Sequence, residues 1–548
     1  MNNSHEFKHY IVTNPHSFSS YLQECLGKEK YEELNKQIQT KVKWIQKYSP
    51  FESKEIMSLI LDYLETREIF DTIYPVCKKW KETFPFPLIW KQRKFILSDL
   101  TKIDLDKIHS QIPSITDFEI NMKYKDLESI ASNASVELFE KFVQLEKFSI
   151  KFKFPTNYQQ NNTHCLLILS LLISFLSPLS LKKLEIDFDI SQLLLPTFYI
   201  SRFPCLQELI LHNLYFESWE WITDFKSTLQ TLKITQNVYP HSLPVSFFTS
   251  LNECINLENL HLNIRRFKKN NITTETLSFL AIKGLFDIKK LPKLKCVKLE
   301  GNASQLFPIF YYQEENNTIS SFPTTLILNH NTGVASSFWQ DLPVATNIAY
   351  LQFSSLKNLH LRRFTLPEIN SQEEEEEKKG STLFDLLKYA SNLEELKLED
   401  YVLPFGFHCP HFCLLSHLSK YYSKSLRSLS VIKCYYFPTI DFQGEKKFEI
   451  DLQNLDSFPQ LEILYLQDVT ILPCPNITIT TTRTPILKEV SLLDIQQKDS
   501  FPTINKWIKE QKPSLKYLCI NQKELLDQEC YALFKSNLYV SKKMEIPK

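Results

Sequence analysis

The side chains best suited to chemistry lie close together in the C-terminal half of the chain. Between His408 and His417 the sequence holds four side chains of the types that bind zinc, namely Cys409, His411, Cys413 and His417 itself. Their spacing, C-x-H-x-C-x3-H, matches no common structural zinc pattern. We therefore expect them to be packing residues of a helix rather than metal ligands, and a zinc site is the alternative.

Glycine is scarce, with seven residues in a chain of 548, and none has a second glycine near it. Phosphate cradles, nucleophile elbows and dinucleotide-binding turns all need glycine at fixed positions, because the backbone there is left-handed or closely approached. No H-E-x-x-H helix and no paired-carboxylate signature is present in the sequence either. A catalytic triad can still assemble from distant positions. The sequence itself predicts neither catalysis nor a cofactor.

Charge and hydropathy narrow the range of partners. Lys plus Arg and Asp plus Glu both total 63, so the chain has no basic excess of the kind that nucleic-acid binding requires. The most apolar run, Cys165–Leu176, is too short for the roughly 30 Å core of a bilayer. The N-terminus has no apolar signal core, and the twelve cysteines include no C-x-x-C. We expect a reduced protein of the cytoplasm or nucleus that binds neither nucleic acid nor membrane.

The segment Pro50–Leu97 is rich in apolar residues for its length. Apolar residues recur every three or four positions in its first part, which predicts a helix, and two shorter helical pieces follow. Two Trp and about a dozen large aliphatic residues occur within the segment. That is more apolar surface than so small a unit can bury alone, so the segment needs a partner surface.

The same segment resembles an F-box. Glu55–Leu64 (EIMSLILDYL) matches that family's first helix, Val76–Trp80 (VCKKW) its second motif, and Pro87–Trp90 (PLIW) follows at the family's spacing. Glu52-Ser53 replaces the usual Leu-Pro pair, and Pro75 lengthens the interval between the first two motifs by one residue. The resemblance implies that a Skp-family adaptor binds the apolar positions Ile56, Leu59, Ile60, Leu64, Val76, Trp80 and Trp90. The residues alone also permit an ordinary helical hairpin inside a larger domain.

Beyond Leu97 the motif L-x-x-L-x-L, with Ile, Val or Phe allowed, recurs along the chain. Eleven clear copies begin at Leu181, Leu206, Leu229, Leu257, Leu294, Leu356, Leu393, Leu426, Leu461, Leu487 and Leu515. Three weaker copies begin at Ile115, Leu145 and Pro323, and most starts are 23–37 residues apart. Each copy predicts a short strand whose inward side chains are buried only by neighbouring copies, so the copies must stack.

This pattern resembles leucine-rich repeats. The resemblance implies an α/β fold, in which a short helical F-box is followed by an irregular horseshoe of parallel strands and helices. Helices are predicted before two of the strands, at Thr382–Tyr389 and Phe412–Tyr422. The family places Asn or Cys three residues after the last motif position, and only Asn237, Asn302, Asn331 and Cys434 do so here. Chance leucine periodicity in an unrelated α/β fold is the alternative.

We divide the chain into four parts on these grounds. Residues 1–49 form an N-terminal helical segment, 50–97 the F-box, 98–523 a solenoid of about fourteen degenerate repeats, and 524–548 a C-terminal cap and tail. Inside the solenoid, residues 367–380 include five consecutive Glu. Such a block predicts a solvated loop, and a docking strip for a basic partner is the alternative.

Together the two resemblances imply a substrate receptor of a cullin-RING (SCF-type) ubiquitin ligase. The F-box would bind the adaptor, and through it a cullin, while the repeats hold an unknown protein substrate. Such a receptor catalyses nothing itself and acts by raising the local concentration of its substrate. A leucine-rich-repeat interaction scaffold without ligase output is the alternative, and an enzyme is the third reading.

The repeats also predict a binding face. Residues two, four and six after the first motif position alternate with the buried leucines and face the open side of the strands. In the first four repeats these positions are polar except for Ile210, whereas in the last four half are apolar, aromatic or Cys. We therefore predict partner binding at Ile432, Ile463, Tyr465, Leu493 and Tyr517, because tyrosine is favoured at interface centres. The alternative is that the C-terminal cap covers this face.

Overall fold

The computed structural model describes the chain in stretches separated by gaps. The described residues are 28–30, 32, 36, 94–97, 116–123, 144–153, 173, 176, 179–188, 193–194, 200, 202–216, 218–236, 245–264, 290–301, 323–329, 355–362, 390–400, 402–403, 415, 418–419, 422, 424–436, 446–472, 487–495, 501–511, 514–521, 526–534 and 538–540. The F-box motifs, the helix predicted at Thr382–Tyr389, the acidic loop 367–380 and the four candidate zinc ligands lie outside them. The chain divides into two compact units, Met1–Glu217 and Ser218–Lys548.

The first unit contains a run of parallel strands. In sheet order these are β1 (Lys94–Leu97), β2 (Asp117–Lys123), β3 (Lys147–Lys153), β4 (Lys183–Phe188) and β6 (Glu208–His212). Two shorter strands, β5 (Leu193–Leu194) and β7 (Leu214–Tyr215), pair beside them. Strand β1 lies at the end of the segment that resembles an F-box, so the repeat sheet begins before the first recognisable leucine motif.

The second unit continues the same pattern with parallel strands throughout its main sheet. In sheet order these are β8 (Thr231–Gln236), β9 (Asn259–Ile264), β10 (Cys296–Gly301), β11 (Thr325–Asn329), β12 (Asn358–Arg362), β13 (Glu395–Glu399), β15 (Ser428–Ile432), β19 (Ile463–Gln467), β21 (Glu489–Leu493), β22 (Tyr517–Ile520) and β23 (Leu538–Val540). Strand β23 follows the predicted cap and pairs with β22, which the leucine pattern did not reveal.

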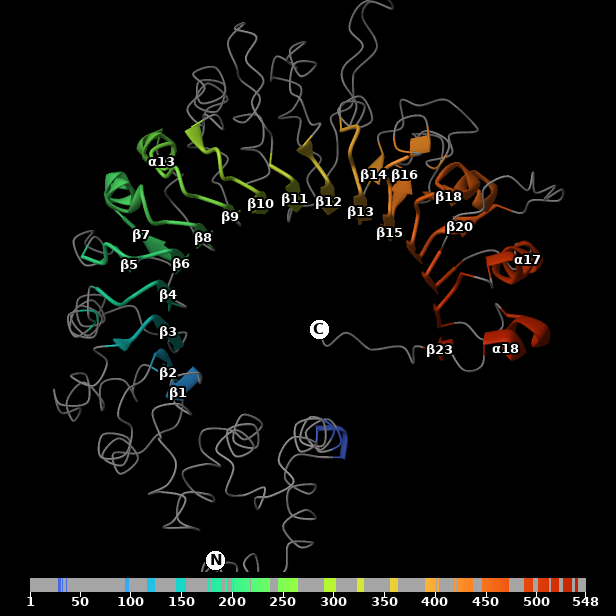
Figure 1. Ribbon diagram of the computed structural model, residues 1–548, viewed down its shortest axis with the longest axis horizontal. Coiled ribbons are helices and arrows are strands. Elements are labelled where there is room, and N and C mark those ends of the chain that lie inside the picture. The colour runs from blue at the N-terminus through green and yellow to red at the C-terminus, as the bar shows by residue number, and fades with distance from the viewer. Residues whose placement is uncertain are drawn as a thin grey trace, which may run out of the picture. The chain divides into compact units, whose positions relative to one another are not determined.

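The helices of the second unit lie on one side of this sheet. They are η3 (Glu220–Phe225), α13 (Val245–Leu251), η9 (Leu452–Ser457), α17 (Phe501–Gln511) and α18 (Gln528–Phe534). In Figure 1 the strands of this unit line the inner side of a curve, with α13, α17 and α18 outside it. Within the range predicted as a helix before Leu426, the described residues Leu415, Leu418 and Tyr422 are helical and fully buried.

Each of the fourteen predicted motif copies leads into one strand of these sheets. The copy at β12 is representative, because Leu356, Leu359 and Leu361 are only 2%, 4% and 1% exposed. Neighbouring copies align in register, so that Leu359 and Leu361 pair with Leu396 and Leu398 of β13. The chain therefore forms an α/β leucine-rich-repeat solenoid, as the sequence predicted.

Several strands end in a left-handed turn made without glycine. The residue two positions after the last motif leucine has a positive φ at Asn213, Asp400, Lys433, Asp468 and Asp494. The backbone N–H of three of them donates to a carbonyl of the next repeat, at 2.8–2.9 Å. At the end of this series no equivalent carbonyl is used, and the N–H of Asp494 donates instead to Oδ1 of Asn521, at 2.9 Å. The turn thus links each repeat to the next.

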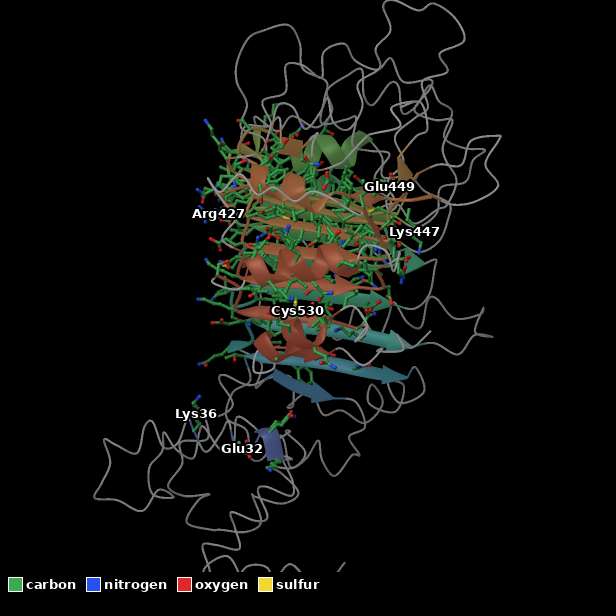
Figure 2. The ribbon with its side chains drawn as sticks, turned by 90° about the vertical axis from the view of Figure 1, so that its right-hand side faces the viewer. Glu32, Lys36, Arg427, Lys447, Glu449 and Cys530 are labelled. Carbon is green, nitrogen blue, oxygen red and sulfur yellow. The ribbon has the colours of Figure 1, made fainter. Side chains whose placement is uncertain are left out.

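Short second strands follow three of these turns in the second unit, namely β14 (Val402–Leu403), β16 (Tyr435–Tyr436) and β20 (Thr470–Ile471). Two further short strands pair with them, β17 (Lys446–Lys447) with β16 and β18 (Glu449–Ile450) with β20. Cys434, predicted for the turn, is fully buried and its thiol lies 3.6 Å from the carbonyl oxygen of Leu398. Figure 2 shows Arg427 at the edge where the strands begin, and Lys447 and Glu449 at the opposite edge.

The turn at Lys433 yields a test of this architecture. Its φ of 49° is unfavourable for a residue with a Cβ and most unfavourable for a β-branched one. Lys433→Val should therefore lower the free energy of unfolding by about 1–2 kcal/mol relative to Lys433→Gly. Urea denaturation followed by circular dichroism measures the difference. The same pair of changes at Lys424, exposed and outside the left-handed region, should favour Val or show no difference. Equal stability of the two Lys433 variants would contradict the assigned turn.

Candidate protein-interaction face

Strand register in the second unit places alternate residues in rows along the face opposite the helices, here called the open face. The middle row is Lys233, His261, Lys298, Ile327, His360, Lys397, Ser430, Tyr465, Ser491 and Cys519. The row nearer the strand ends is Thr235, Asn263, Glu300, Asn329, Arg362, Glu399, Ile432, Gln467 and Leu493. Both rows contain charged residues up to β13 and only uncharged residues from β15 onward.

The five residues predicted for partner binding all belong to the open face of β15 to β22. We call Ile432, Ile463, Tyr465, Leu493 and Tyr517 the apolar patch. Ile463 is 39% and Tyr517 is 42% exposed, and the other three are half-buried. Among the described residues, the other exposed large hydrophobic side chains are Leu179 and Ile255, which lie in turns before strands. The structure therefore brings the predicted residues together on one accessible face.

Tyr465 lies near the centre of this patch. Its neighbours in the middle row are Ser430 on β15 and Ser491 on β21, whose small side chains leave the ring half-exposed. The Tyr465 hydroxyl donates to Oε1 of Gln467, at 3.1 Å. Partial burial raises the pKa of Tyr465, and the nearby Cys519, Asp494 and Glu399 add to the effect. The phenol is therefore neutral at physiological pH and available for apolar contact.

The C-terminal helix α18 does not cover the patch. Its first turn is capped by Asp527, whose Oδ1 accepts from the Cys530 N–H at 2.7 Å. It docks on α17 through Lys509, which lies 3.1 Å from Asp527 and 2.5 Å from Glu529. Since α17 and α18 lie on the helical side of the sheet (Figure 1), Tyr517 remains exposed on the other side.

The charged half of the open face contains a constellation that occurs twice. His261 Nε2 lies 2.5 Å from Oε2 of Glu300, and Lys298 Nζ lies 3.1 Å from Oε1 of the same carboxylate. The equivalent residues three strands further on are His360, Lys397 and Glu399. There His360 Nε2 and Lys397 Nζ lie 3.4 Å and 3.1 Å from Oε2 of Glu399. We call these residues, with Arg362, the polar patch.

Sequence reasoning did not single out the polar patch. Its signal was present, since Asn-Leu-His-Leu occurs at Asn259–Leu262 and again at Asn358–Leu361. In both cases the next strand contains Lys-Leu-Glu, at Lys298–Glu300 and at Lys397–Glu399. Each histidine is 39 residues from its glutamate in the sequence, because 300 − 261 and 399 − 360 both equal 39. Only the strand register shows that they meet.

The carboxylates of the polar patch are held in the charged form. Burial alone would raise the pKa of Glu300, but hydrogen bonds from His261 and Lys298 outweigh it and lower the pKa to about 2. Burial would likewise raise the pKa of Glu399, but the hydrogen bond and charge of Lys397 outweigh it, so the pKa is lowered. Burial and the charge of Lys397 lower the pKa of His360, so this imidazole is neutral at pH 7.

The remaining site predictions concern residues outside the described part. The seven predicted adaptor contacts fall there, as do the candidate zinc ligands. Among the residues that the structure describes, no three His, Cys, Asp or Glu side chains are grouped so that they could hold a metal ion. Within the same residues, no helix is both long and apolar enough to cross a lipid bilayer.

Comparison with known proteins adds little to this description. No model of a protein family matches the chain, and no curated protein matches its sequence. Among solved structures, an internalin from Listeria monocytogenes is similar over 76% of this chain and 94% of its own, with 13% identity and a TM-score of 0.33. We draw no functional argument from a likeness of this size.

The Glu300 contacts predict a pH dependence. A carboxyl whose pKa is lower in the folded than in the unfolded protein adds stability above its unfolded pKa, which is lost as the pH falls through the folded pKa. With values of 4.5 and about 2, this loss occurs below about pH 4.5. Because the open face is solvated, we expect the contribution to be only about 1–2 kcal/mol.

Glu300→Gln should therefore lower the thermal midpoint at pH 6 and have a smaller effect at pH 3. Differential scanning calorimetry across this range measures it, with Glu489→Gln at an exposed position of β21 as the control. An equal effect of Glu300→Gln at both pH values would contradict the assigned ion pairs.

Proposed function

We propose that this protein is an interaction scaffold that binds another protein on the open face of its C-terminal repeats. The apolar patch is the observation that carries this proposal. Two of its five side chains are exposed by about two-fifths although the chain has a continuous core in which to bury apolar residues. A solvated sheet face gains nothing from exposing Ile463 and Tyr517, whereas an interface gains both apolar area and a hydroxyl.

The surroundings of the patch support this proposal. The neighbouring positions Ser428, Ser430 and Ser491 are small and uncharged, so a partner can approach Tyr465 without removing a charge of its row neighbours from water. Glu489 lies between Ile463 and Tyr517 in the register and is itself exposed, which places one charge at the side of the patch where the strands begin. Interface centres are depleted of charge and enriched in tyrosine in the same way. Apart from Glu489, the charged residues in these open-face rows lie on β8–β13, as expected of the polar rim of an interface.

Removing the two tyrosines tests the proposal. Tyr465→Ala with Tyr517→Ala should reduce partner capture at least tenfold, because truncation of central aromatic residues costs about 2 kcal/mol or more. Quantitative affinity purification from cells measures the loss. The matched control is Leu179→Ala with Ile255→Ala, which removes exposed apolar area outside the patch and should leave capture unchanged. The opposite result, or equal losses in both variants, would contradict the proposal.

We further propose that the scaffold is the substrate receptor of an SCF-type ubiquitin ligase. The support for this finer function is the F-box resemblance of Glu55–Leu64, Val76–Trp80 and Pro87–Trp90. An adaptor bound at residues 50–97 would connect a cullin to the repeats, and a substrate on the apolar patch would be held close to the ubiquitin-charged enzyme. The receptor itself would supply binding and no bond chemistry.

A cytoplasmic or nuclear location fits this proposal. The described cysteines Cys254, Cys434 and Cys530 are fully buried and form no disulfide, and burial raises the pKa of the Cys254 thiol to about 12. Buried thiols of this kind pack as small apolar groups and suit a reducing compartment. Scaffolding without ligase output remains the second candidate function.

A charge in the first helix of the F-box tests the adaptor. Ile60→Asp should abolish adaptor binding, because an unpaired carboxylate in an apolar contact costs several kcal/mol. The repeats bury their own leucines against one another from β2 onward and should survive, as circular dichroism would show. Mass spectrometry of proteins purified with the chain separates the two functions. Adaptor together with cullin supports the receptor, and adaptor alone supports a scaffold. Wild-type adaptor capture by Ile60→Asp would contradict the F-box assignment.

A further inference from the structure

The two copies of the polar patch differ at one position, and that difference changes their charge. In the copy on β9 and β10, the residue two after the histidine is Asn263, and Glu300 is balanced by Lys298. In the copy on β12 and β13 the same position is Arg362, whose Nε lies 3.2 Å from Oε1 of Glu399. Lys397 also contacts Glu399, at 3.1 Å. Two permanent cations therefore share one carboxylate in the second copy, which leaves one positive charge in excess.

The second copy also has nitrogen atoms whose hydrogen-bonding capacity is unused. His360 Nε2 and Arg362 Nε are buried from solvent, and neither makes a hydrogen bond of normal geometry, although both lie within ion-pair distance of Glu399. Buried polar atoms are normally satisfied, and each one left open costs about 1–3 kcal/mol. The Arg362 and Lys397 side chains are 39% and 33% exposed, so an incoming anionic group can reach the excess charge, and Arg362 has an unused donor beside it.

We propose that His360, Arg362 and Lys397 bind an acidic side chain of the same protein segment whose apolar side chain binds at Tyr465. This inference rests on the proposed function, because it names the chemistry of the partner held by the apolar patch. The segment is extended, crosses the strands, and carries one Asp or Glu at a set distance from an aromatic or large aliphatic residue.

The strand register sets that distance. Lys397 on β13 pairs with Ser430 on β15, which pairs with Tyr465 on β19. Two strand spacings of about 4.8 Å separate Lys397 from Tyr465, and a third spacing reaches His360 on β12, with Arg362 two residues further along that strand. The acidic group and the apolar side chain are therefore about 10–14 Å apart, which an extended chain covers in about three or four residues.

The charge of the site favours a carboxylate over a phosphate. Lys397 and Arg362 against Glu399 leave one uncompensated positive charge, which a single carboxylate neutralises. A phosphorylated side chain would bring nearly two negative charges beside Glu399, and the repulsion would offset its stronger attraction. A carboxylate also fits the planar donor arrangement of Arg362.

A peptide selection tests the inference. Phage-displayed random dodecapeptides are selected on the full-length protein, and binders are ranked by their loss on the Tyr465→Ala, Tyr517→Ala variant. We expect the tyrosine-dependent binders to share an Asp or Glu three or four positions from an apolar residue. In fluorescence anisotropy, Glu→Gln in such a peptide should weaken binding about tenfold, since a charged hydrogen bond is worth about 1.5–3 kcal/mol.

Two variants of the protein connect this effect to the site. Arg362→Gln with Lys397→Gln should weaken the Glu peptide about tenfold and bind the Glu and Gln peptides equally. Lys233→Gln with Lys298→Gln removes the same charge from β8 and β10 and should change binding less than twofold. Circular dichroism and the thermal midpoint establish that both variants are folded. A phosphoserine peptide should bind no more tightly than the Glu peptide.

The outcomes separate this inference from the function on which it rests. Tyrosine-dependent peptides without a preferred acidic residue would overturn the inference and leave the apolar patch as the binding site. Equal losses of binding in the Arg362→Gln, Lys397→Gln variant and in the Lys233→Gln, Lys298→Gln variant would overturn it as well. So would a phosphoserine peptide that binds more than tenfold tighter than the Glu peptide. If every selected peptide bound the Tyr465→Ala, Tyr517→Ala variant with the same affinity as the wild type, the proposed function and the inference would both be overturned.

Discussion

No repeat of this protein can bury its own leucines, and the rest of the structure follows from that constraint. A single five-residue strand such as β12 has two inward leucines and no second layer of its own large enough to cover them. Alignment of Leu359 with Leu396, and of Leu396 with Leu429, covers each leucine with its neighbour. The stacking is reinforced at the strand edges, where the N–H groups of Glu394 and Glu395 donate to Lys357 of the preceding repeat. Each repeat is therefore stable only as part of a series.

Because the inward-facing residues form the core, the residues of the open face can vary. Core positions alternate with open-face positions along each strand, so a change from Lys397 to Ser430 or Tyr465 alters the surface and leaves the leucine stack intact. Charged residues persist on the open face where they have polar partners, as Glu300 contacts His261 on the neighbouring strand and Lys298 on its own. After β13 such contacts stop, and uncharged side chains, among them Ile432, Tyr465 and Leu493, occupy the same rows. The two patches are thus consequences of one geometry with different side chains.

Hydrogen bonds between repeats stabilise tight turns that this glycine-poor chain makes with other residues. A residue such as Asp468, with a φ of 57°, adopts a conformation that costs about 1 kcal/mol. Its N–H gains a hydrogen bond to the carbonyl of Leu493 that would otherwise be left open at the edge of the stack. Asn and Asp tolerate this conformation better than most residues, and they hold four of the five described turns. The five described left-handed turns are therefore made by polar residues, without glycine.

The leucine pattern by itself determined the fold class, the number of recognisable repeats and the residues of the apolar patch. It could do so because burial against a neighbour imposes a fixed spacing on each strand, and the alternation of a strand then assigns every other residue to the open face. The pattern did not predict strands β1 and β23, because β1 lies within an F-box-like segment and β23 is only three residues long.

The tertiary structure decided what the one-dimensional pattern does not contain. The pairing of His360 with Glu399 depends on which strand lies beside which, and on a register that brings residues 39 positions apart into contact, since 399 − 360 is 39. The choice of Asp400, Lys433 and Asp494 for left-handed turns, and the position of α18 on the helical side of the sheet, likewise depend on neighbouring repeats. Local spacing specifies a strand, whereas contacts between distant residues exist only once the strands have stacked.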